Sequence, residues 1–202
     1  LAGPGGALRF SGMRAGGRGK AEKAAVDIDE AVSLFRAWRD LRGEAWALQT
    51  LAWLSFIEGE YNTAEARLET SAATFGELGD WGGVSWALGL LAWVRFTQGR
   101  MEEARELAVR MEQEARELGN RWAGAMMNVL LANIGVWTGD PETAMEQARA
   151  ALDVFRALGD TWGELQAMST LILAQAMSGH YTRAIAPIVE AETSVFKVLD
   201  DS

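Results

Sequence analysis

Apolar residues recur along this chain at helical spacing, and the pattern itself repeats every 40 residues. One phase holds Leu51, Leu91, Leu131 and Leu171, a second Gly59, Gly99, Gly139 and Gly179, and a third Ala64, Ala104, Ala144 and Ala184. Apolar positions three and four residues apart predict amphipathic helices rather than strands. A fixed period of this length is typical of a solenoid, in which each unit buries its apolar face against the next.

Each period is predicted to contain a first helix, A, and a second helix, B. The A helices are expected at Gly43–Glu58, Val84–Gln98, Gly124–Thr138 and Gly163–Ser178. The B helices are expected at Thr63–Leu78, Glu102–Leu118, Glu142–Leu158 and Thr182–Leu199, with one more upstream at about Ala21–Asp40. Because the links between them are short, consecutive helices should lie antiparallel.

The residues between the helices have the character of helix ends. A glycine at the end of each B helix, Gly79, Gly119 and Gly159, should adopt a positive φ. The Asp or Asn that follows can cap the next A helix. Among the B helices, Asp140 with Pro141 predicts an N-cap followed by proline, and Asn62 with Glu65 has the spacing of a capping box.

The array is expected to occupy residues 19–202. It would consist of a half repeat at 19–40 and repeats at 41–80, 81–120, 121–160 and 161–199. Residues 1–18 are rich in glycine, which disfavours a helix, so they are predicted to be a basic linker or a degenerate first helix.

The conserved phases within the chain match a known repeat pattern. That pattern has a large apolar residue, a Leu and a small residue on the first helix, then a Gly, an aromatic residue and an Ala. The second repeat fills these positions with Leu48, Leu51, Ala52, Gly59, Tyr61 and Ala64. In these positions the sequence resembles tetratricopeptide repeat (TPR) proteins, although its period exceeds the usual ~34 residues. The resemblance implies an all-α fold, a right-handed α-α superhelix of antiparallel helix pairs.

The long repeat with Leu-Gly-Asp links also resembles the sensor arrays of bacterial transcriptional regulators of the LuxR and STAND types, and bacterial receptors for signalling peptides. This narrower resemblance implies the sensor or interaction segment of a cytoplasmic bacterial regulatory protein, to which other domains would be attached.

The A helices are predicted to have two apolar faces, whereas the B helices have one. One face of the A helix, with Leu48, Leu51 and Ala52, would pack within the array. The other would line the concave side of the solenoid and bind a partner. Its candidate residues are Trp46, Gln49, Trp53, Phe56, Trp86, Trp93, Phe96, Met126, Asn133 and Trp137. Stacking of the repeats would place Trp46 beside Trp86 and Trp53 beside Trp93.

Several occupants of this face stay open at the level of sequence. An exposed apolar patch of this size usually has a partner, which favours a protein or peptide groove. A closed aromatic pocket for a small-molecule inducer is the alternative. The tryptophans could instead pack as core, be covered by another domain, or join two copies of the chain in a structural, dimerising array.

Composition argues against catalysis. The chain has no cysteine, and His180 is its single histidine, so neither a Ser-His-Asp triad nor a zinc site is expected and no cofactor is predicted. The net charge of −9 argues against direct contact with nucleic acid. The sequence has no apolar run of the ~20 residues that a membrane span needs.

Overall fold

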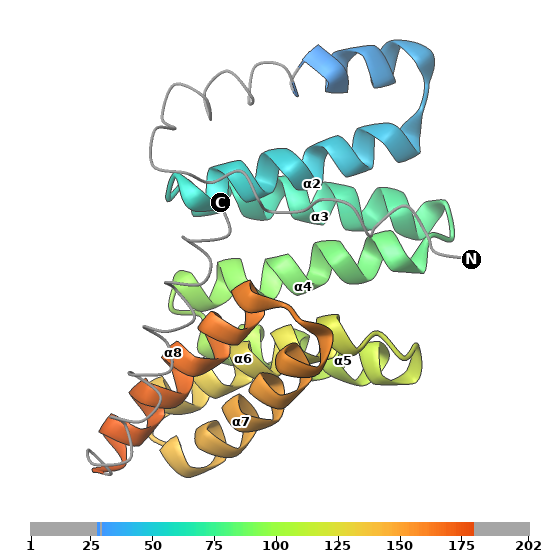
Figure 1. Ribbon diagram of the computed structural model, residues 1–202. Coiled ribbons are helices and arrows are strands. Elements are labelled where there is room, and N and C mark those ends of the chain that lie inside the picture. The colour runs from blue at the N-terminus through green and yellow to red at the C-terminus, as the bar shows by residue number, and fades with distance from the viewer. Residues whose placement is uncertain (1–27, 29, 180–202) are drawn as a thin grey trace, which may run out of the picture.

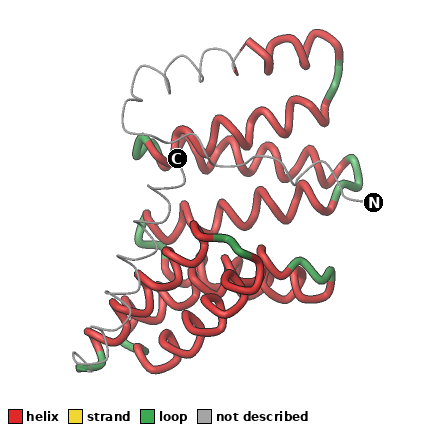
Figure 2. The backbone as a smooth tube through the Cα atoms, viewed as in Figure 1, coloured by secondary structure: helices red, strands yellow, loops and turns green. Residues whose placement is uncertain are grey.

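The computed structural model describes residue 28 and residues 30–179, which form helices joined by short turns (Figures 1 and 2). Residues 30–38 are helical and precede the array proper. The helices that follow are α2 (Leu41–Ile57), α3 (Tyr61–Glu77), α4 (Trp81–Thr97), α5 (Met101–Glu117), α6 (Arg121–Thr138), α7 (Pro141–Leu158) and α8 (Thr161–Met177). The A helices are therefore α2, α4, α6 and α8, and the B helices are α3, α5 and α7.

This alternation confirms the predicted helix pairs over the described residues. Each helix begins one to three residues earlier than predicted, because it starts directly after its N-cap residue. The glycine-rich residues 1–18, His180 and the last B helix at Thr182–Leu199 lie outside the described residues.

The predicted caps of the A helices are confirmed. The side chains of Asp40, Asp80, Asn120 and Asp160 each accept a hydrogen bond from the backbone N–H three residues later, at 2.9–3.1 Å. These bonds satisfy backbone donors that a helix end leaves unpaired. The seven turn glycines of the described array all have positive φ, between 67° and 87°, so both turns of each repeat use the left-handed conformation that glycine tolerates.

The B helices begin differently from one another. Asp140 accepts from the N–H of Thr143 at 3.2 Å, with Pro141 in the first helical position, as predicted. The capping box at Asn62 is wrong, because the N-cap of α3 is Glu60 and makes no side-chain capping bond. Asn62 instead accepts a hydrogen bond from the side-chain amide of Gln98 in the neighbouring repeat, at 3.1 Å.

Phenylalanine and glycine lock the B helices to the A helices that follow them. The ring of Phe75 is fully buried and covers Gly83 in the first turn of α4, where a Cβ atom would overlap it. Phe155 covers Gly163 of α8 in the same way. In the intervening repeat, the position equivalent to Phe75 and Phe155 is Ala115, and the position equivalent to Gly83 and Gly163 is Ala123. The two residues of this contact therefore change together.

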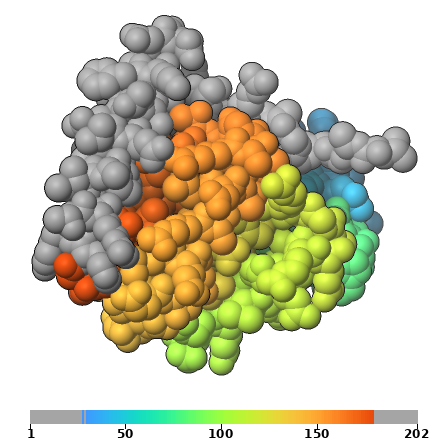
Figure 3. Space-filling view, turned by 60° about the horizontal axis from the view of Figure 1, so that its bottom comes forward, coloured from blue at the N-terminus to red at the C-terminus, as the bar shows by residue number. Residues whose placement is uncertain are grey.

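The A helices form the inner layer of the array. Contacts between repeats join α2 with α4, α4 with α6, and α6 with α8, whereas the described B helices contact only A helices. Figure 1 shows the pairs stacked in chain order, and Figure 3 shows the second half of the stack as closely packed helices. None of the helices in the described ranges is long and apolar enough to cross a membrane.

Candidate functional site

One side of the A helices carries mostly apolar residues, and packing leaves most of them partly exposed. We define the inner face as the positions in phase with Trp46, Trp53 and Ile57 on each A helix. Its members are Trp46, Trp53, Ile57, Trp86, Trp93, Thr97, Met126, Asn133, Trp137, Gln166, Leu173 and Met177. None of these residues is charged, so the inner face is an apolar surface with few polar groups.

Exposure of large apolar residues differs between the two layers. On the inner face, Trp86 is 41% exposed, Trp137 67% and Met177 62%. On α3, α5 and α7 the exposed large apolar residues are Val109 and the terminal Leu158, and the helical residues 30–38 upstream expose Leu34 and Trp38. The B helices therefore show the single apolar face of an outer layer, whereas the A helices bury one apolar face and present another.

In the first full repeat, the tryptophans of the inner face pack against other aromatic rings. Trp46 contacts the buried ring of Phe75 edge to face, with ring centroids 4.9 Å apart. Trp53 stacks on Phe56 of its own helix at 5.6 Å, and Phe56 contacts Tyr61 at 5.9 Å. Trp46, Trp53 and Phe56 are all half-buried, so each has one packed side and one open side.

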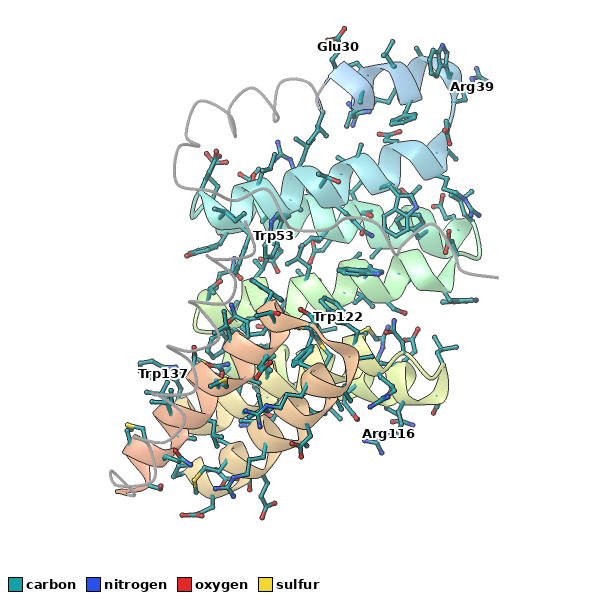
Figure 4. All side chains as sticks on the ribbon, in the orientation of Figure 1. Glu30, Arg39, Trp53, Arg116, Trp122 and Trp137 are labelled. Carbon is teal, nitrogen blue, oxygen red and sulfur yellow. The ribbon has the colours of Figure 1, made fainter. Side chains whose placement is uncertain are left out.

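The next repeat also places a tryptophan against a phenylalanine of its own helix, and it adds a ring contact between repeats. Trp93 meets Phe96 edge to face at 6.1 Å. Trp86 stacks on Trp122 of α6, with centroids 5.5 Å apart and an interplanar angle of 29°. In Figure 4, the labelled Trp53 of α2 and Trp122 and Trp137 of α6 show how tryptophans continue from one A helix to later ones.

The register of these contacts differs from the expected one. Trp46 pairs with Phe75 and Trp86 with Trp122 among the described rings, rather than Trp46 with Trp86. Trp86 and Trp122 are 36 residues apart, one helical turn short of the period. Trp122 was not among the predicted site residues. Its recurrence as Trp162, 40 residues later, is the signal in the sequence that could have indicated it.

Three of the predicted polar or flexible candidates take part in internal packing. Gln49 is buried and its side-chain amide donates to the carbonyl of Gly83 at 2.9 Å, which ties α2 to α4. Met126 is 7% exposed and belongs to the central core. Asn133 is half-buried and donates to the carbonyl of Val129 and to the hydroxyl of Thr170 on α8, both at 2.9 Å.

The N-cap aspartates also connect neighbouring A helices. The indole N–H of Trp122 donates to the carboxylate of Asp160, the N-cap of α8. Arg42, in the same phase as Trp122, forms an ion pair with Asp80, the N-cap of α4, at 3.1 Å. Each of these carboxylates therefore caps its own helix and fixes the first turn of the previous A helix.

Charged groups cluster away from the inner face, where α3, α4 and α5 meet. Glu65 accepts from Arg100 at 2.7 Å and from Arg95 at 3.2 Å, and Arg100 also pairs with Glu103. Burial alone would raise the pKa of Glu65, but hydrogen bonds from Gln98, Arg100 and Arg95 outweigh it and lower the pKa. The hydrogen bond from Arg100 likewise lowers the pKa of Glu103. These charges bind one another and hold the repeats together.

The inner face offers aromatic rings and hydrogen-bond donors as contact groups. Within the described ranges, no three His, Cys, Asp or Glu side chains come together in a way that could hold a metal ion. Two open hollows lie in this part of the chain: one at residues 59–63 and Gln98, and the other beside Phe35, Trp46 and Thr50.

Comparison with known proteins identifies the fold. Two crystal structures of a Podospora anserina protein with nearly identical TPR-like repeats, provisionally named a kinesin light chain, match with TM-scores of 0.66 and 0.64. They are 15% identical and cover 90% and 89% of this chain and the same shares of their own chains. BtubC (BKLC) from P. vanneervenii matches with a TM-score of 0.57 and 18% identity, over 88% of this chain and 92% of its own.

No protein-family model matches the sequence, and no curated protein matches it. At these identities the structural likeness establishes the fold, which is a TPR-like α-α superhelix. The narrower resemblance to LuxR- and STAND-type sensor arrays stays a prediction.

Proposed function

We propose that this array is a protein-binding scaffold whose inner face receives a partner polypeptide. The observation that carries the proposal is the difference between the layers: α2, α4, α6 and α8 expose tryptophan and methionine on one side, whereas α3, α5 and α7 expose little that is large and apolar. Contiguous exposed apolar surface of this kind usually marks an interaction site. A half-buried tryptophan fits such a site well, because its ring is already held in one conformation.

A polypeptide fits this surface better than a small molecule does. Ligand pockets usually enclose most of their ligand, but the two hollows beside Tyr61 and beside Trp46 are open. The uncharged positions also continue over four A helices, which suits an elongated partner. A small-molecule inducer and a second copy of this chain are the alternatives.

We further propose that the array is the interaction or sensor segment of a larger, cytoplasmic bacterial regulatory protein. This part rests on the resemblance of its Leu-Gly-Asp links to the arrays of such regulators. Partner binding on the inner face would then regulate the rest of the protein.

Selection from a phage-displayed library of random peptides tests the binding proposal. We expect enriched peptides to bind the wild-type array and to lose at least tenfold in affinity with Trp137→Ala, because hot-spot tryptophans contribute about 2 kcal/mol or more. Val109→Ala is the matched control, since Val109 is an exposed apolar residue of the outer layer. Equal binding to both variants, or no enrichment, would contradict the proposal.

Stability measurements separate a binding role from a core role. Trp137 is 67% exposed, so its replacement by alanine should change the free energy of unfolding by less than about 0.5 kcal/mol. Trp93 packs against the central core, so Trp93→Ala should destabilise by about 2 kcal/mol or more. Sedimentation of the array at high concentration tests the alternative in which a second copy covers the face, since that alternative requires a dimer.

A further inference from the structure

The inner face has unused hydrogen-bond donors and almost no other unpaired polar hydrogen. Within the part of the chain that the structure describes, the indole N–H groups of Trp46, Trp86, Trp93 and Trp137 have no hydrogen-bond partner. The indole of Trp122, by contrast, is bonded to Asp160. A partner that covers these indoles must supply acceptors, because a donor that is buried without a partner is costly.

The other hydroxyl and amide donors near these tryptophans are already used, with the exception of the side-chain amide of Gln166 on α8. The Thr50 hydroxyl donates to the carbonyl of Trp46, and the Ser169 hydroxyl to that of Leu165. The amide of Asn133 donates to Val129 and Thr170. The defined inner-face positions therefore present flat apolar rings, indole donors and the amide of Gln166, and Asp40 and Arg42 lie beside Trp46 at the N-terminal end of the face.

We infer that the inner face binds a proline-rich segment in the polyproline II conformation. This inference rests on the proposed function and names the chemical class of its partner. Proline has a backbone carbonyl and no N–H, so a proline-rich segment provides acceptors for the indoles without donors that the face would leave unpaired. Its uncharged rings pack on aromatic side chains, as in other recognition of this conformation.

The spacing of the repeats agrees with this conformation. A polyproline II helix rises about 3.1 Å per residue and turns every three residues, which gives about 9 Å per turn. Packed helices lie about 8–10 Å apart, and Cα atoms of α2 and α4 approach within 8 Å. One turn of the segment thus corresponds to about one A helix, so successive turns would meet successive A helices.

Other polypeptide conformations match the donors less well. An amphipathic helix would bury the same apolar area, but its backbone carbonyls already accept hydrogen bonds within the helix. A strand normally binds by extending a sheet, and the described part of the chain is helical. Only an extended segment with free carbonyls provides an acceptor at each repeat.

Titration with a decaproline peptide tests the inference, with the indole N–H resonances of ¹⁵N-labelled protein as the readout. We expect the resonances of Trp46, Trp86 and Trp93 to move downfield, whereas that of Trp122 should move least because its bond to Asp160 is already made. A peptide of five Gly-Ser units and an amphipathic helix of leucine and lysine are the comparison ligands.

Conservative variants test the role of the donor. Trp86→Phe keeps a ring against Trp122 but removes the N–H, and should weaken decaproline binding about five- to tenfold, the loss of one hydrogen bond. Trp81→Phe is the control: Trp81 is 66% exposed, but it lies five residues earlier on α4, about 140° around the helix from Trp86. Its replacement should leave the affinity unchanged, and circular dichroism should show equal helix content in both variants.

The possible failures are distinguishable. If the leucine–lysine helix binds more tightly than decaproline and Trp86→Phe does not weaken it, the proline-rich partner is refuted and the binding scaffold stands. Equal affinity of the wild type and Trp86→Phe for decaproline also refutes it, because the donors would then be unused. If neither peptide binds, the inference is again refuted, and the peptide library decides the proposed function separately.

Discussion

The contact between Phe75 and Gly83 gives the sharpest test of how these repeats pack. Phe75 is fully buried, its ring touches Trp46, and it occupies the space that a Cβ atom on Gly83 would need. Phe75→Ala removes a buried ring and should destabilise by about 3–5 kcal/mol. Gly83→Ala forces the ring to move, at about 1–3 kcal/mol, which the better helix propensity of alanine offsets by up to about 1 kcal/mol.

The double variant should lose less than the sum of these effects. Once the ring is gone, the new methyl group on residue 83 meets no obstacle and fills part of the cavity. The chain itself uses this combination one repeat later, where Ala115 faces the helix that carries Ala123. We therefore expect a favourable coupling energy of at least about 1 kcal/mol between Phe75→Ala and Gly83→Ala.

Urea unfolding of the four proteins, followed by the fluorescence of the tryptophans and by circular dichroism, measures this coupling. Unchanged slopes of the unfolding free energy against urea would show that the same unit unfolds in each protein. Additivity within about 0.5 kcal/mol would refute the reasoning, because it would mean that the alanine at 83 and the phenylalanine ring do not compete for space.

Three further predictions concern the turns, the caps and the charges. Gly99→Ala should destabilise by about 1 kcal/mol or more, because φ is +80° there, whereas Gly76→Ala, in an open helical position, should stabilise by a few tenths to 1 kcal/mol; similar effects of both on the midpoint of thermal unfolding would contradict this. Asp160→Ala should destabilise by about 1 kcal/mol more than Asp140→Ala, because the carboxylate of Asp160 also accepts the indole of Trp122; equal losses in urea unfolding would show that the indole bond contributes nothing. The pKa of Glu65 is lower in the folded chain, so its contribution is present above the unfolded pKa of about 4.3 and is lost as the pH falls through the folded value. The difference in stability between wild type and Glu65→Gln should therefore shrink below about pH 4, and a constant difference down to pH 2 would contradict the assignment.

The fold could be predicted because local signals in the sequence agree with one another. The 40-residue period, the glycines at both turns and the capping aspartates locate the same helix boundaries independently. Asn62 shows the limit of such signals: its spacing to Glu65 suits a cap, but the helix already begins at Tyr61. A backbone path that tertiary packing fixes can override a favourable local motif.

The ring contacts of the inner face could not be predicted from phase alone. Equal phase assumes that successive A helices lie side by side at equal height, which would pair residues 40 apart. The observed links between A helices join Gln49 to residue 83, Trp86 to Trp122, and Asn133 to Thr170, separations of 34, 36 and 37 residues. Neighbouring A helices are therefore displaced or inclined by about one helical turn, a consequence of superhelical packing that the sequence period does not encode.

The same displacement explains why these tryptophans are not simply core or simply groove. A displacement of one turn lets Trp46 rest on Phe75 and Trp86 on Trp122, so that each ring is fixed on one side by its neighbours. The indole N–H groups of Trp46, Trp86 and Trp93 have no hydrogen-bond partner within the described residues. Because packing already restricts the rings, binding would sacrifice little side-chain entropy. The contacts that stabilise the array would thus also restrict the rings that the proposed partner covers.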